Sequence, residues 1–250
     1  MQEFTCTTWN ILAPEFVKCD YYESVACPRL NVGTRREDIY KHIERLNSDV
    51  FILQEVTKEE YKLLEKRFDN YKMKLSLHDA KHWAADSTKK RQRNGNAIMV
   101  KKTLKLKKPT KLALSVNGNK GLVAQVKIGK TEITVCSIHL DDISAKTRMS
   151  QLKTLLKHTK KSPMLLIGGD FNDPSPTIRN YMTKHHFDSS YDHSTNPTYM
   201  EEKDMAIDFV FTRGVKMHNV HIPQTDRQKI IREFGSDHLP VTVHVVVAEQ

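Results

Sequence analysis

The chain has no apolar run near the roughly 18 residues that a membrane span needs, so no membrane partner is expected. Its first five residues lack a basic region followed by an apolar one, so no signal peptide is predicted. There are four cysteines, and no pair has C-x-x-C spacing. Cys6 and Cys136 lie in alternating apolar segments and are expected in the core, whereas a metal site using Cys19 and Cys27 is disfavoured. Reduced thiols favour a cytoplasmic or nuclear protein.

Internal repeats and low-complexity linkers are also absent, which excludes repeat arrays. A chain of 250 residues with 38% hydrophobic residues can bury a substantial core. We therefore expect residues 1–250 to form a single domain.

Positive charge is in excess. Lys plus Arg number 40 against 30 Asp plus Glu, which gives a net charge of +10. The excess is concentrated in residues 101–111 and in a predicted mobile loop, 86–94, that carries Lys89, Lys90, Arg91 and Arg93. Simple solubility is the alternative, but local concentration favours a polyanion such as nucleic acid, with these four side chains binding it.

Strand-like and helix-like segments alternate along the chain. Capping boxes at Thr34 and Thr57 predict two helices, and apolar residues at helical spacing from Met149 to Leu156 predict a third. Gly129-Lys130 marks a hairpin. The predicted strands cover residues 4–9, 50–53, 97–100, 112–116, 122–128, 133–138, 164–167, 207–211, 215–222 and 241–247. This pattern favours an α/β domain with two packed sheets and flanking helices.

Polar residues fall where these strands end. They are Asn10, Glu55, Asn96, His139, Asp170 and Asp208. Asp170 and Asn172 follow the apolar run Met164 to Ile167, and period-2 alternation predicts that their side chains point to one side. Hard oxygen ligands at a strand end suit Mg²⁺ and a phosphate.

A second acidic block lies near the C-terminus, at Ser236-Asp237-His238-Leu239-Pro240. Asp208 sits inside an apolar strand, where an acid needs a partner, and His238 is the natural candidate. The carboxylate would hold the histidine in its charged form. Together the two blocks indicate metal-assisted phosphodiester hydrolysis.

Taken singly, most of these residues have an ordinary alternative role. Glu55 fits a charge at a helix N-terminus, Asn10 a turn, and His139 a structural histidine. Arg148, three residues before Gln151 on one helix face, is either a surface charge or a phosphate ligand. Asn96 is a turn residue or a ligand, and Tyr199 packs a loop or lines the cleft.

In combination the blocks resemble the endonuclease/exonuclease/phosphatase superfamily. The matching segments are Trp9-Asn10, Gln54-Glu55, Gly95-Asn96-Ala97-Ile98, His139-Leu140, Gly169-Asp170-Phe171-Asn172, Ile207-Asp208-Phe209 and Ser236-Asp237-His238, in family order. The resemblance implies a four-layer α/β/β/α sandwich with two packed mixed sheets. It also implies divalent-metal hydrolysis of phosphate esters.

The resemblance further implies roles for individual residues. Glu55 would be the main Mg²⁺ ligand, with Asn10 beside it and Mn²⁺ as a possible substitute. Asp170 and Asn172 would orient the attacking water and the phosphate or help hold a second metal, and Asp237 would be a further metal-side acid. His238, held by Asp208, and His139 would contact the phosphate.

Residues 8–13 and 48–56 look like the deadenylase, nocturnin and Angel branch. That likeness implies a 3′–5′ exonuclease on single-stranded RNA with some preference for adenine. Asn96, Arg148 and Tyr199, which lies in a turn-like segment shortly before Asp208, are the further candidates for substrate binding. The chain has no leucine-rich repeat, so its protein partners are unknown. The alternatives are a phosphodiesterase on 2′,5′-oligoadenylate or tyrosyl-DNA, and a catalytically silent nucleic-acid-binding module.

Overall fold

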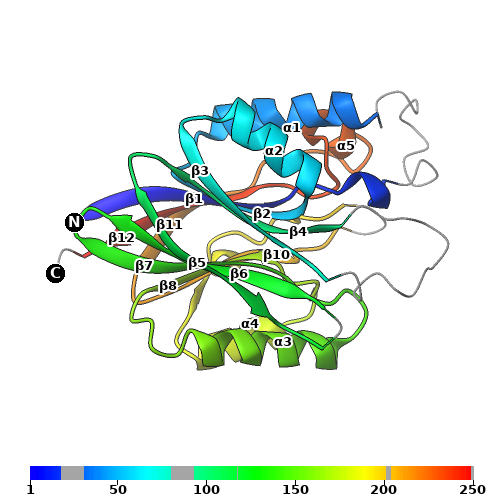
Figure 1. The fold of residues 1–250 in the computed structure, drawn as a ribbon. Helices are drawn as coiled ribbons and strands as arrows, with labels where there is room; N and C mark the ends of the chain where they lie inside the picture. Colours follow the sequence, from blue (N-terminus) through cyan, green and yellow to red (C-terminus); the bar gives the residue numbers. More distant parts are fainter. Residues whose placement is uncertain (18–30, 80–92, 117, 201–203, 249–250) are drawn as a thin grey trace.

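Two six-stranded sheets lie face to face, with helices on both outer faces (Figure 1). The computed structural model describes residues 1–17, 31–79, 93–116, 118–200 and 204–248. The first sheet has the order β11-β12-β1-β2-β4-β3, and the second has the order β5-β6-β7-β8-β10-β9. Both sheets are mixed, because β1–β2 and β7–β8 pair in parallel and the other neighbours pair antiparallel.

The strands of the first sheet are β1 (Gln2–Asn10), β2 (Val50–Thr57), β3 (Tyr71–Leu77), β4 (Asn94–Lys101), β11 (Lys216–His221) and β12 (Val241–Val247). Those of the second are β5 (Lys105–Ala113), β6 (Lys120–Ile128), β7 (Thr131–His139), β8 (Leu165–Asp170), β9 (Asp188–Ser189) and β10 (Asp208–Arg213). The helices are α1 (Val32–Leu46), α2 (Lys58–Arg67), α3 (Ala145–His158), α4 (Thr177–Lys184) and α5 (Ile230–Phe234), with short 3₁₀ turns η1 (Pro14–Phe16) and η5 (Ser190–Asp192).

Figure 1 shows α1, α2 and α5 over the first sheet and α3 and α4 over the second. The architecture is therefore an α/β/β/α sandwich, as predicted. Within the described part of the chain, no helix has the length and apolar character to cross a membrane.

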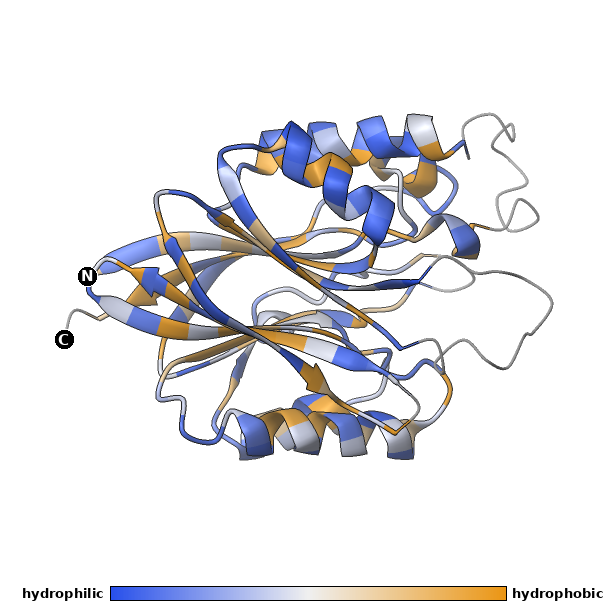
Figure 2. Ribbon diagram, viewed as in Figure 1, coloured by the Kyte–Doolittle hydropathy of each residue, from blue (hydrophilic) through white to orange (hydrophobic). Residues whose placement is uncertain are grey.

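The main core joins buried residues of both sheets with buried residues of α1, α2 and α5, and hydrophobic residues recur along the strands of both sheets (Figure 2). Ile52, Leu166 and Val210 are fully buried there. Cys6 and Cys136 are buried free thiols, as predicted, and burial raises the pKa of both. The two sheets lie so close together at Gly168 that a side chain there would collide with the opposite sheet, since a Cβ on Gly168 would lie 2.8 Å from Ile52 Cδ1.

Several sequence predictions need correction. The N-cap of helix α1 is Asn31, whose side chain accepts a hydrogen bond from the Gly33 amide, so Thr34 is not the cap. Thr57 does cap α2, accepting from the Glu60 amide at 3.1 Å, as predicted. The strand expected at residues 112–116 is instead β5, whose lysine-rich residues form an exposed sheet edge. Strands β3 and β9 and helices α4 and α5 were not predicted.

Strand direction explains where polar groups meet. The parallel strands β1 and β2 end together, and so do β7 and β8, at the end of the sandwich away from the N-terminus (Figure 1). The antiparallel strands β10 and β12 begin at that same end. Six chain segments thus deliver their terminal residues to one rim.

Candidate active site

The register of the second sheet brings three predicted residues together. Asp170, the last residue of β8, lies directly opposite Asp208, the first residue of β10, and beside His139, the last residue of β7. His139 Nε2 is 3.5 Å from Asp170 Oδ2. Both aspartates are almost fully buried. The first sheet contributes Asn10 and Glu55 across the gap.

Glu55 has an unusual backbone conformation. Its φ of 60° is left-handed, and it lies at an irregularity in the β2–β4 pairing between Leu53 and Val56. Its carboxylate accepts hydrogen bonds from Asn10 Nδ2 at 2.9 Å and from the Ala13 amide at 2.7 Å. The extra residue in β2 therefore turns Glu55 toward the rim, and Thr57 is left to cap α2.

Asn10 links the carboxylates of the two sheets. Its Nδ2 atom lies 3.2 Å from Asp170 Oδ2 as well as 2.9 Å from Glu55 Oε1. Its Oδ1 atom accepts from the Leu12 amide at 3.0 Å, which fixes the orientation of the side chain. Asn10 is thus a bridging residue in addition to a turn residue.

The predicted Asp208–His238 pair is confirmed. His238 Nδ1 lies 2.8 Å from Asp208 Oδ2, and the Thr198 hydroxyl donates to the same oxygen at 2.7 Å. The Trp9 indole donates to the backbone oxygen of His238 at 2.9 Å. These contacts turn His238 Nε2 toward the acids, 3.7 Å from Asp170 Oδ2 and 3.9 Å from Asp237 Oδ1.

Burial dominates the electrostatics of the cluster. It raises the pKa of Glu55, and together with the negative charge of Asp208 it raises the pKa of Asp170 to about 7. Burial lowers the pKa of His139. Burial also opposes the charged form of His238, but Asp208, Asp237 and Asp170 outweigh it and hold the pKa of His238 well above its usual value.

These residues fit a divalent cation. Glu55, Asp170 and Asp237 supply hard carboxylate oxygens, the donor type that Mg²⁺ prefers. Among the described residues, no Lys or Arg forms an ion pair with Glu55 or Asp170, although both are buried. A cation would compensate the buried negative charge that the described Lys and Arg side chains leave without an ion pair.

Asn172 does not follow the alternation expected of it. Strand β8 ends at Asp170, and Asn172 adopts a left-handed φ of 51°. Its amide nitrogen donates to Asp170 Oδ1 at 2.9 Å, and its side-chain Nδ2 donates to the Leu140 oxygen at 3.0 Å. The prediction that period 2 aligns Asp170 and Asn172 is therefore wrong, because the chain turns between them.

Other predicted substrate residues make local contacts. The buried Asn96 donates to the Lys120 backbone oxygen at 2.7 Å, joining the two sheets. Arg148 donates to the Asp141 backbone oxygen at 3.0 Å, which holds the loop after β7. Arg93 donates to the backbone oxygen of His78. Lys89, Lys90 and Arg91 lie outside the described residues, and the substrate roles of all six residues stay predictions.

Tyr199 lies at the cluster. Its ring centroid is 4.8 Å from that of His238, and the two residues form an isolated β-bridge. Thr198, beside it, was missed by sequence reasoning although it supports Asp208. A threonine in a turn-like segment carries no pattern that distinguishes this role.

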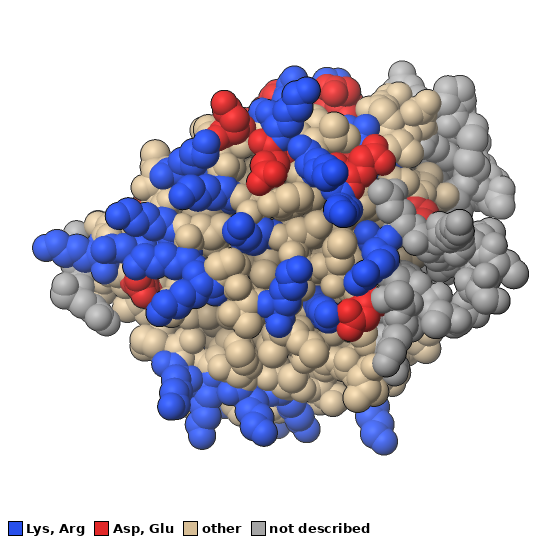
Figure 3. Space-filling view, viewed as in Figure 1, with Lys and Arg blue, Asp and Glu red and all other residues tan. Residues whose placement is uncertain are grey.

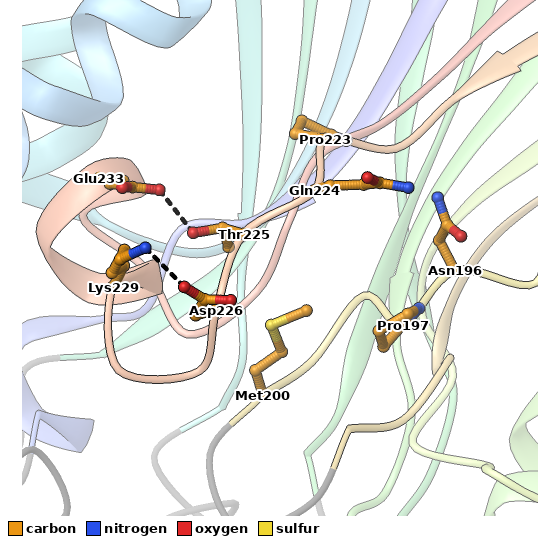
Figure 4. Close-up of a pocket in the computed structure, with 9 residues that line it drawn as sticks. All are labelled: Asn196, Pro197, Met200, Pro223, Gln224, Thr225, Asp226, Lys229 and Glu233. Atoms are coloured by element: carbon orange, nitrogen blue, oxygen red, sulfur yellow. Dashed lines mark hydrogen bonds and ion pairs between the residues drawn. The ribbon is translucent and has the colours of Figure 1, made fainter.

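The structure also has a pocket of about 500 Å³ (Figure 4). It is lined by Asn196, Pro197, Met200, Pro223, Gln224, Thr225, Asp226, Lys229 and Glu233. None of the acids and histidines of the cluster lines it. Met200 connects the two regions, because its amide donates to the Asp237 backbone oxygen at 3.1 Å. We place the chemistry at the cluster, where acids and histidines converge, and regard the pocket as adjacent space.

The family model for the endonuclease/exonuclease/phosphatase family matches residues 7–238. The chain belongs to this family. Members of the family hydrolyse phosphate esters, and this fold generally uses a divalent metal. No curated protein sequence matches the chain significantly.

Solved structures share the family fold at low sequence identity. ANGEL2, described as a 2′,3′-cyclic phosphatase, has 17% identity and a TM-score of 0.83, over 98% of this chain and 95% of that one. The human nocturnin catalytic domain with bound sulfate has 16% identity and a TM-score of 0.71, over 99% and 94%. D. rerio TDP2 with a single-strand DNA product has 15% identity and a TM-score of 0.73, over 98% and 99%.

Proposed function

We propose that this protein is a Mg²⁺-dependent phosphodiesterase that shortens single-stranded RNA from its 3′ end, with a preference for adenines. Mn²⁺ is the expected substitute ion, and residues 1–250 form the single catalytic domain. The observation that carries the proposal is the convergence of Glu55, Asp170 and Asp237 with Asn10 and His238 at one rim.

Five residues would hold the metal: Asn10, Glu55, Asp170, Asn172 and Asp237. When bound, the ion supplies a positive charge that activates water and neutralises negative charge on the phosphate. Asn10 keeps Glu55 and Asp170 close together across the two sheets.

The chain's own groups complete the chemistry. His238, kept positively charged by Asp208, donates from Nε2 to a phosphate oxygen, and His139 donates to another. Asp170 accepts a proton from the attacking water, which Asn172 orients, while the bond between phosphorus and the leaving oxygen breaks.

A basic face supports a polymeric substrate. Lys and Arg side chains spread over the face on which β3 and β5 lie, with few acids among them (Figure 3). Lys72, Lys74, Lys105, Lys108 and Lys111 are exposed there. Lysines on edge strands also prevent edge-to-edge pairing. Their positive charge additionally suits a phosphate backbone, together with Arg148 and the basic segment 89–93.

Tyr199 is the proposed stacking surface for a base. Its ring packs against His238, so a base resting on it would hold the neighbouring phosphate at the cluster. The adjacent pocket offers space for a further nucleotide.

A second candidate keeps the same metal site but changes the linkage. ANGEL2 is described as a 2′,3′-cyclic phosphatase, and TDP2 has been solved with a DNA product. The substrates of this second candidate are 2′,5′-oligoadenylate, tyrosyl-DNA and RNA ending in a 2′,3′-cyclic phosphate.

The test is a substrate panel with Mg²⁺ or EDTA. It contains 5′-labelled oligo(A), mixed-sequence RNA, circular RNA, single-stranded DNA and the three alternative linkages. We expect a Mg²⁺-dependent ladder that shortens the oligo(A) from its 3′ end, and none with Glu55→Gln. Cleavage of circular RNA would indicate an endonuclease, and activity confined to another linkage would favour the second candidate. Inactivity on every substrate would favour a silent binding module.

A further inference from the structure

Two histidines and a glutamate meet on the outer face of the first sheet, away from the catalytic cluster. Glu3 comes from β1, His244 from β12 and His218 from β11, which are adjacent strands. His218 lies directly opposite His244 in the antiparallel register. Phe4, which follows Glu3, and Val245, which follows His244, are buried in the core, so the three polar side chains point outward.

The ligand atoms are already close. Glu3 Oε1 is 2.8 Å from His244 Nδ1 and 3.2 Å from His218 Nε2. All three atoms lie within 4.8 Å of one another. The side chains are partly exposed, so an ion can reach them from solvent. The three strands pair in one sheet, so the backbone already holds the three residues near one another before an ion binds.

These separations suit one tetrahedral ion. Zinc binds imidazole nitrogen and carboxylate oxygen at about 2.0–2.2 Å, so ligand atoms around it lie roughly 3.3 Å apart. The observed distances require movements of side chains only. Two imidazoles with one carboxylate leave a fourth position for water. Imidazole selects Zn²⁺, Cu²⁺ or Ni²⁺ over Mg²⁺, in contrast to the oxygen-rich cluster at the other end of β1.

We propose that Glu3, His218 and His244 form a second metal site that takes a divalent transition ion of the Zn²⁺ class. The ion would tie the edge strand β11 to β12 and β1. Seven residue-to-residue steps along the extended strand separate Glu3 from Asn10, about 23 Å, so the site acts independently of catalysis. The exposed pair His193–Asp188, at 3.4 Å, forms no such group of three among the described residues.

The experiment titrates ZnCl₂ into metal-stripped full-length protein by calorimetry, in buffer that contains excess Mg²⁺. Variants His218→Ala, His244→Ala and Glu3→Gln are compared with His221→Ala. His221 is an exposed residue of the same strand that is not part of the cluster, so it is the matched control. We expect the wild type and the His221→Ala control to bind one equivalent of Zn²⁺. We expect the affinity for Zn²⁺ to fall at least about tenfold in His218→Ala and His244→Ala.

Thermal melting gives a second readout. Zn²⁺ should raise the melting temperature of the wild type and of His221→Ala, but raise it less in the two cluster histidine variants. Mg²⁺-dependent phosphodiesterase activity should be unchanged in all four variants, which separates this site from the catalytic one. Zinc binding that is the same in His218→Ala and His244→Ala as in the wild type, or an equal loss in His221→Ala, would overturn the proposal.

Discussion

The Asp208–His238 pair offers the sharpest test of the site. Asp208 Oδ2 accepts hydrogen bonds from His238 Nδ1 at 2.8 Å and from Thr198 Oγ1 at 2.7 Å, and both members of the ion pair are buried. An amide at position 208 keeps the shape but removes the charge that holds His238 positive. Removing one partner of a buried ion pair typically costs about 3–5 kcal/mol.

If even about 3 kcal/mol of this cost falls on the transition state, kcat should fall on the order of a hundredfold in Asp208→Asn. His238→Ala should lose at least as much. Because the two residues act as one unit, the double variant should be little worse than His238→Ala alone. We expect a coupling energy of roughly 2–3 kcal/mol.

The assay is a double-mutant cycle on steady-state hydrolysis of the best substrate in the panel, with melting temperatures to confirm folding. Asp173→Asn is the matched control: it alters a buried aspartate that accepts hydrogen bonds from the amides of Ser175 and Ile178. This variant should lose stability without coupling to His238. Losses for Asp208→Asn and His238→Ala that add within about 0.5 kcal/mol would refute the idea that Asp208 acts through the histidine.

Four further predictions concern separate features. Glu55→Gln should fold normally and lose about a thousandfold in Mg²⁺-dependent rate, and near-normal turnover would remove Glu55 from the metal site. Gly168→Ala should lower the free energy of unfolding in urea by about 1–3 kcal/mol, because its Cβ would lie 2.8 Å from Ile52 Cδ1; an unchanged midpoint would contradict that packing. Burial opposes the charged form of Asp49, but hydrogen bonds from Thr5 and Lys101 outweigh it and lower the pKa of Asp49. The stability lost in Asp49→Asn should therefore be largest above the ordinary aspartate pKa, and it should vanish as the pH falls through the lowered pKa of Asp49 in the folded protein. A difference in stability that does not change with pH would contradict this linkage. Charge reversal of the basic segment 89–93 or of the β5 lysines should flatten the salt dependence of RNA binding, whereas an unchanged slope would mark them as solvated surface.

The sequence predicted those parts of the fold in which burial imposes a pattern. Most core strands were placed within a few residues, because apolar runs in this chain are short and bounded by turn residues. The Asp208–His238 pair followed from one rule, that an acid inside an apolar strand needs a partner. The four-layer arrangement was predicted from the order of the sequence blocks that resemble the superfamily, because hydrophobic periodicity alone does not predict it.

Edge elements were harder to predict. Strand β5 exposes most of its residues at the sheet edge, so hydrophobic alternation does not constrain its position. Helix α5 has only five residues, too few for a helical pattern. Strand β3 is different, because Tyr71 and Met73 alternate with exposed lysines in a regular period of two, and that signal was present but not used.

Backbone conformation at the rim marks the limit of sequence reasoning. Seven described residues other than glycine have positive φ, and three of them, Leu12, Glu55 and Asn172, lie at or just beyond the place where β1, β2 or β8 leaves regular pairing. Leucine and glutamate adopt this conformation only at a cost, typically of order 1–3 kcal/mol. The sequence Gln54-Glu55-Val56 does not predict the positive φ of Glu55, because the same residues fit a regular strand that leads into a capped helix. The surrounding sheets hold the strained geometry, and its effect is to turn Glu55 toward Asn10 and away from the helix. Such strain is expected where a carboxylate must face a ligand instead of the core, so the feature that best separates this site from an ordinary strand end exists only in three dimensions.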